Sequence, residues 1–163
     1  MRSGHTQTQI TLHWAVVALI AFQYLGSDGI ERAWRAYASG AYTPDDLSGL
    51  ALAHMVSGVL VLVLVIWRLI LRATVGAPPP HPAEPKFLQF LSRLAHFAIY
   101  ALIIVLPLSG LAGWAGGVEG AVRVHLIAKT ILLPLIGLHV LGALVHHFVW
   151  RTDVLKRMLA PSQ

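Results

Sequence analysis

The stretch that decides the fold of this chain is VRVHLIAKTILLPLIGLHVLGALVHHFVW, residues 122–150. A helix needs about 20 apolar residues to cross a bilayer core, and this stretch is longer than that. It nevertheless contains the polar residues His125 and His139. A helix turns by about 100° per residue, so two histidines 14 residues apart lie on nearly the same face, about 21 Å apart along the axis. The stretch therefore predicts one transmembrane helix that carries two polar sites on a single stripe.

Three further apolar stretches, residues 10–26, 47–71 and 87–114, are also long enough to cross a membrane. Apolar residues make up 56% of the chain and charged residues only 12%, whereas soluble domains carry about 25% charged residues. We therefore expect an all-α protein, a four-helix transmembrane bundle that forms a single domain, residues 1–163. The polar amino end lacks a small-residue cleavage site after its first apolar run, so we expect the first helix to be retained.

Local signals predict where these helices begin and end. Residues 43–46, Thr-Pro-Asp-Asp, combine a cap, a first-turn proline and two acids, which predicts the start of the second span. Gly116 and Gly117 predict the end of the third span. The prolines in residues 75–82 favour an extended linker between the second and third spans.

The distribution of arginine and lysine predicts the orientation, because cytoplasmic loops of membrane proteins are enriched in both. One side collects Arg2, Arg68, Arg72, Lys86, Arg93, Arg151, Lys156 and Arg157, and the other side collects Arg32, Arg35, Arg123 and Lys129. We therefore expect both termini to be cytoplasmic. In the loop after the first span, Ile30, Trp34 and Tyr37 have the spacing of a short interfacial helix.

The composition also excludes several classes of site. The chain has no cysteine, which excludes disulfides, cysteine-ligated iron–sulfur clusters, covalently attached haem and zinc ribbons. The net charge of +5 does not indicate nucleic-acid binding, because the basic residues lie at helix ends rather than on one polar face. Any metal must therefore be held by histidine or oxygen ligands.

Nine histidines in so apolar a chain need partners, because an unsatisfied polar ring costs several kcal/mol in hydrocarbon. Four of them match in depth: His13 pairs with His139 near the inner surface, and His54 pairs with His125 near the outer surface. Two histidines that face each other inside a helix bundle are typical axial ligands of a six-coordinate haem. We therefore predict two b haems, with these four residues as the iron ligands.

Smaller features agree with haem sites. Arg68 lies 14 residues after His54, so it reaches the depth of the inner pair, where it can meet a haem propionate. Gly58, on the turn after His54, lacks a side chain that would collide with a macrocycle, as do Gly110 and Gly113 on the third span.

The alternative for any single histidine is a hydrogen-bonded packing residue. We favour that interpretation for His96, His146 and His147, and we expect His5 and His81 to be solvated. Four tryptophans have the positions of interfacial belt residues: Trp14, Trp67, Trp114 and Trp150.

Taken together, four groups of residues resemble the bacterial cytochrome b561 family over almost the whole chain. The groups are Thr11-Leu12-His13-Trp14; His54 with Gly58 and Arg68; Leu94-Ala95-His96 with Tyr100, Pro107 and Gly110; and Gly137-Leu138-His139 with His146-His147. The resemblance implies a four-helix bundle in the bacterial inner membrane that holds two b haems on His13, His54, His125 and His139.

Within that family, the chain resembles the small di-haem superoxide:ubiquinone oxidoreductases. This likeness implies an oxidoreductase that oxidises superoxide on the periplasmic side and passes the electrons through both haems to ubiquinone. Two details depart from the family: His125 lacks an acidic neighbour, and Lys129 stands where an apolar residue is usual. The outer basic residues Arg32, Arg35, Arg123 and Lys129 would attract the anionic donor, unless they pair with the acids Asp28, Glu31, Asp45, Asp46 and Glu119.

Two rival functions remain open. A related b-type cytochrome can serve as the membrane anchor that links a dehydrogenase or hydrogenase to the quinone pool, although short loops favour a protein that acts alone. A histidine-lined transporter would place polar residues along a continuous path, which these spans lack. Quinone reduction takes up protons, for which the inner histidines His96, His146 and His147 are candidates.

Overall fold

The computed structural model describes residues 4–79 and 85–161, and this part of the chain is helical without strands. Its elements are α1 (Gln7–Leu25), α2 (Asp28–Ala38), the short 3-10 helix η1 (Pro44–Asp46), α3 (Gly49–Thr74), α4 (Lys86–Gly116), α5 (Glu119–Phe148) and the 3-10 helix η2 (Lys156–Met158). Four helices, α1, α3, α4 and α5, are long and apolar enough to cross a membrane. The prediction of an all-α chain with four spans is therefore confirmed for the described residues.

The start of α3 differs from the prediction. Thr43 and Asp46 form a capping box, but they cap η1, which stands apart from the span. α3 itself begins at Gly49, and the Ser48 hydroxyl accepts a hydrogen bond from the backbone N–H of Ala51. The Thr-Pro-Asp-Asp motif thus forms a separate turn. The span has its own cap, Ser48, three residues before Ala51.

The other predicted boundaries agree more closely. α4 ends at Gly116, and Gly117 adopts a left-handed conformation with φ 63°, which favours glycine at a helix end. Residues 76–79 of the predicted linker are not helical, while His81 and the neighbouring prolines lie outside the described residues.

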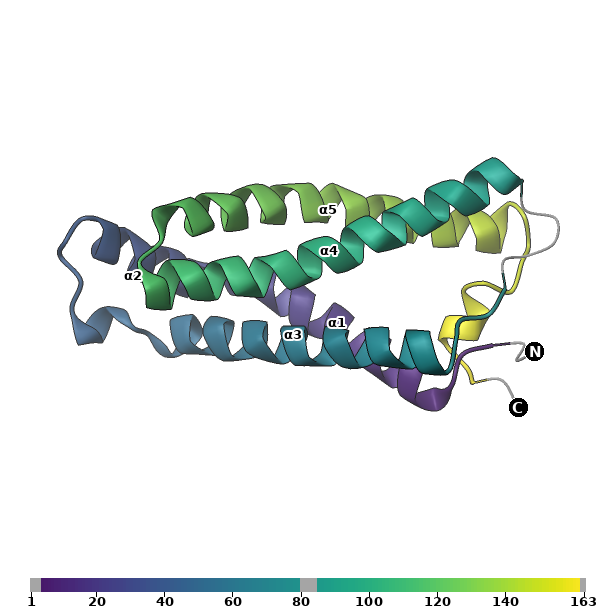
Figure 1. The fold of residues 1–163 in the computed structure, drawn as a ribbon, viewed down its shortest axis with the longest axis horizontal. Helices are drawn as coiled ribbons and strands as arrows, with labels where there is room; N and C mark the ends of the chain where they lie inside the picture. The colour runs from purple at the N-terminus through teal and green to yellow at the C-terminus, as the bar shows by residue number, and fades with distance from the viewer. Residues whose placement is uncertain (1–3, 80–84, 162–163) are drawn as a thin grey trace.

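The bundle is built from pairs of neighbouring helices: α4 packs on α5, α1 on α3, and α3 on α4 (Figure 1). A small apolar core lies between them, formed by Val16, Val61, Val65, Ile103 and Leu132. Large apolar side chains also cover the outside, for example Leu138, which is 62% exposed. Such an apolar exterior is expected of helices that face lipid.

Both termini lie at the same end of the bundle, here called the inner end, and α2 lies at the opposite, outer end (Figure 1). A chain that crosses the bundle four times must begin and end on the same side. The distribution of arginine and lysine still predicts that the inner end faces the cytoplasm.

α2 confirms the short helix predicted after the first span. Its Gly29 and Ala33 are buried, and a Cβ on Gly29 would lie 2.7 Å from the Cβ of Leu50 on α3. Only glycine therefore permits this approach of α2 to α3. Aromatic rings join α2 to α4 as well, since Trp34 lies 6.4 Å from Trp114 between ring centroids.

Candidate functional site

The inner histidine pair joins α1 to α5. The ring centroids of His13 and His139 are 6.4 Å apart, with their planes at 62°. When two imidazoles bind one metal from opposite sides, with each metal–nitrogen bond about 2 Å long, their centroids are separated by roughly 6 Å. The spacing of this pair therefore fits two axial ligands of one metal.

His96 of α4 lies beside the inner pair, with its ring centroid 5.0 Å from that of His139. Its Nδ1 is 2.6 Å from the backbone oxygen of Ser92. Because a carbonyl oxygen only accepts, Nδ1 carries the proton. The sequence predicted such a packing role for His96 but not its contact with His139, since no sequence pattern gives the register of α4 against α5.

Arg68 reaches the inner end of the bundle, as its spacing from His54 predicted. Its guanidinium donates a hydrogen bond of 3.0 Å to the backbone oxygen of Gln9, one turn before His13. It also lies within electrostatic range of His13 and His139. That one hydrogen bond uses one of five guanidinium donors, so Arg68 suits an additional anionic partner such as a carboxylate.

A small cavity of about 30 Å³ adjoins Arg68, and its lining includes His5, Gln9, Arg72, Tyr100 and Met158. His5, expected in solvent, is half-buried there instead. Burial lowers the pKa of His5, and the nearby arginines act in the same direction, against a hydrogen bond with Gln9.

The outer histidine pair joins α3 to α5, where His54 and His125 lie within electrostatic range of each other. The Nδ1 of His125 is 2.8 Å from the backbone oxygen of Leu106 and donates its proton to it. This bond leaves Nε2 unprotonated, which is the form that binds a metal.

His54 has a buried Nδ1 without a hydrogen-bond partner among the described residues. A buried polar nitrogen without a partner costs free energy, so Nδ1 of His54 is free to pair with a water or with a bound group.

The donor set fits haem better than a bare metal ion. Among the described residues, no three histidine, aspartate or glutamate side chains come together as an ion site requires. Two nitrogens at each site suit a group that brings its remaining ligands with it, and haem does so through its macrocycle. The candidate ligands are His13 with His139 and His54 with His125.

The glycines expected to leave room for a macrocycle have other neighbours. A Cβ on Gly110 would lie 3.1 Å from Nδ1 of His125, and one on Gly113 would collide with Val122. Both glycines therefore allow α5 to approach α4, while their role beside a macrocycle stays a prediction. Gly58 lies beside Gln23, whose amide donates a 2.9 Å bond to the backbone oxygen of His54.

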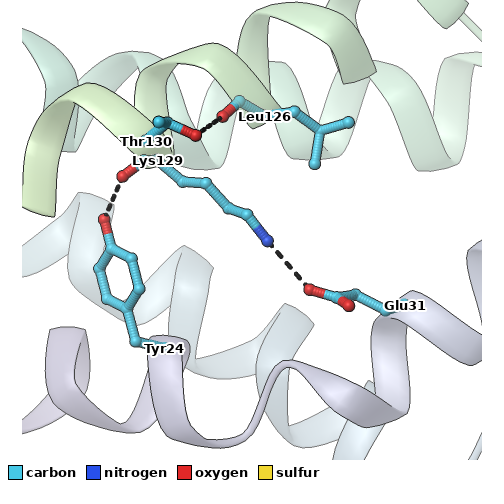
Figure 2. A network of polar contacts seen from close by, with 5 residues as sticks. All are labelled: Tyr24, Glu31, Leu126, Lys129 and Thr130. Carbon is cyan, nitrogen blue, oxygen red and sulfur yellow. Dashed lines mark hydrogen bonds and ion pairs between the residues drawn. The ribbon is translucent and has the colours of Figure 1, made fainter.

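Lys129 forms the main polar contact at the outer end (Figure 2). Its ammonium donates to the Glu31 carboxylate at 2.9 Å, and the Tyr24 hydroxyl donates to its backbone oxygen at 2.6 Å. The hydrogen bond from Lys129 lowers the pKa of Glu31. Of the two predictions for Lys129, the one that pairs it with an acid is therefore confirmed.

The remaining histidines have local contacts at the inner end, as predicted. Nδ1 of His146 lies 3.1 Å from the hydroxyl of Thr152, and the ring of His147 packs on Phe148 at 4.7 Å. Trp14, expected in the interfacial belt, is 43% exposed and also donates a 2.8 Å hydrogen bond to the backbone oxygen of Met158.

The chain is similar to known proteins over almost its whole length. The sequence pattern of the family described as prokaryotic cytochrome b561 matches residues 4–161. A protein of Cereibacter sphaeroides named cytochrome b562 is 32% identical over 159 residues, which covers 97% of this chain and 96% of that protein.

Proposed function

Since the chain belongs to the prokaryotic cytochrome b561 family, which implies electron transfer across a membrane through haem b, we propose that it carries electrons between two such haems. The observation that supports two sites is a histidine pair near each end of the bundle. The ring centroids of the inner pair are 6.4 Å apart, and the two histidines of the outer pair lie within electrostatic range of each other. His13 and His139 would hold the inner haem, and His54 and His125 the outer one. Because α5 would supply one ligand to each, these two ligands lie about 21 Å apart along its axis.

The haems supply the iron that carries the electrons, and the protein orients the ligands. The backbone oxygen of Leu106 holds the Nδ1 proton of His125, which leaves its Nε2 unprotonated and able to bind iron. At the inner site, the guanidinium of Arg68 would bind a propionate, because charge-assisted hydrogen bonds to carboxylates are strong.

We further propose superoxide as the donor and ubiquinone as the acceptor, in a bacterial inner membrane with the outer end in the periplasm. Two superoxide ions would each give one electron and become O₂, and one ubiquinone would take two electrons and two protons. Exposed arginines at the outer end support an anionic donor: Arg32, Arg35 and Arg123. His96, His146 and His147 are the candidates to pass protons to the quinone.

Reconstitution into vesicles that contain ubiquinone tests this function. Superoxide generated outside should reduce the haems quickly and form ubiquinol. In the His139→Ala variant, superoxide should still reduce the outer haem, but ubiquinol formation should stop. If superoxide reduces the haems no faster than it decays in buffer, while a membrane dehydrogenase reduces them readily, the chain serves as an electron-transfer anchor for that enzyme.

A further inference from the structure

Lys129 of α5 contacts both α1 and α2 at the outer end of the bundle. Its ammonium reaches Glu31 on α2 at 2.9 Å, and its backbone oxygen accepts from Tyr24 on α1 at 2.6 Å. Figure 2 shows the lysine side chain extended across the space between these helices toward Glu31. The side chains of Lys129 and Glu31 are 35% and 42% exposed, so water reaches the ion pair that links these helices.

This ion pair lies next to the outer histidine pair. Lys129 follows His125 by one helical turn, and both His125 and His54 are within electrostatic range of its ammonium. His54 is also within range of the Glu31 carboxylate. Two opposite charges therefore act on the outer site from close by.

The helix that carries Glu31 is held in place from three directions. Gly29 packs closely against α3, Trp34 contacts Trp114 of α4, and Glu31 itself binds Lys129 of α5. These three contacts tie α2 to α3, α4 and α5, and so keep Glu31 beside Lys129.

We propose that Lys129 and Glu31 are positioning residues that set the reduction potential of the outer haem by holding balanced opposite charges beside it; this inference rests on the proposed function. Reduction adds one electron to the haem, so a nearby positive charge favours the reduced state and a nearby negative charge favours the oxidised state. While both charges are present, their effects largely cancel. Removal of one charge leaves the other uncompensated.

Three variants of the haem-loaded protein test this balance in a spectroscopic redox titration. Lys129→Met should lower the ratio of reduced to oxidised outer haem at a fixed potential roughly tenfold, a shift of about 59 mV for one electron. Glu31→Gln should raise that ratio by a similar factor. The double variant should return close to the wild-type value, and the inner haem should not change in any of them.

Two controls separate charge from structure. Tyr24→Phe removes a hydrogen bond to the same residue without changing any charge, so the outer potential should stay constant. Lys129→Arg keeps the charge and should restore the wild-type value if Lys129→Met folds poorly. Single variants that shift the potential in the same direction, or not at all, would overturn the inference. Absence of haem from the wild-type protein would instead overturn the proposed function.

Discussion

His13 and His139 face each other from α1 and α5, with ring centroids 6.4 Å apart, at the end of the bundle that holds both termini. The ring of His96 approaches His139 more closely, at 5.0 Å, but it comes from α4, which packs directly on α5. A planar cofactor needs its two ligands on opposite sides. We therefore propose His13, rather than His96, as the partner of His139 at the inner site.

Substitution of these histidines tests that assignment. His139→Ala should lose one of two haems per chain, whereas His96→Phe should keep both, because a ring of similar size preserves the packing against His139. Haem extracted from each purified variant and counted per chain gives the answer. Loss of one haem from His96→Phe, with retention in His13→Ala, would identify His96 as the ligand.

The charge of Arg68 should stabilise the reduced state of the inner haem. Arg68→Leu should lower the ratio of reduced to oxidised inner haem at a fixed potential roughly tenfold, or about 59 mV, because a positive charge near the iron is removed. A redox titration followed at visible wavelengths measures it. Arg93→Leu is a suitable control, since Arg93 is exposed and its Nε bonds to the backbone oxygen of Gln89.

An unchanged inner potential in Arg68→Leu would mean that the guanidinium only extends to the membrane surface. In that case Arg68→Lys should also leave the inner potential unchanged. If Arg68 does bind a propionate, Arg68→Lys should fall between the wild type and Arg68→Leu, because lysine keeps the charge but loses the planar donors.

The stability of the inner end should depend on pH through His5. Burial lowers the pKa of this histidine in the folded protein below the ordinary 6.5, so protons bind more tightly to the unfolded chain. The contribution of neutral His5 is therefore complete above about pH 6.5 and is lost as the pH falls through the lower, folded value.

Thermal unfolding in detergent between pH 7.5 and pH 5 measures this effect. The wild type should lose stability on acidification, and His5→Asn should lose less over the same interval. If the two proteins lose the same amount of stability on acidification, His5 does not contribute to the pH dependence.

Arg123 should help to collect an anionic donor at the outer end. It is exposed in the first turns of α5, whereas Lys129 is already bound to Glu31. Arg123→Gln should therefore slow haem reduction by superoxide by roughly threefold at low salt. Added salt should slow the wild type toward the rate of the variant, because screening limits the reach of the charge to about 8 Å at physiological ionic strength. A rate that is independent of both salt and Arg123 would argue against electrostatic collection.

Length and apolar character predicted most of the fold. Each span was identified from its length and apolar character, and the helices end within three residues of the predicted limits, for example at Phe148 instead of Trp150. The matched depths of His13 and His139 also followed from helix geometry, since the rise per residue is constant.

Contacts between helices could not be predicted in the same way, because they depend on how each helix is rotated against its neighbour. The contact of His96 with His139 and the filling of the space at Gly110 by His125 both arise from the register of α4 against α5. The pairing of Lys129 with Glu31 depends on where α2 folds back, and the sequence offered it only as one of two alternatives.

The most direct test of the two-haem arrangement is a visible spectrum of the purified protein combined with a count of haem per chain. We predict two low-spin b haems per chain, both removed by acid acetone, because no cysteine is present to attach them covalently. A preparation without haem, or haem that stays attached to the protein after extraction, would contradict the assignment of His13 with His139 and His54 with His125.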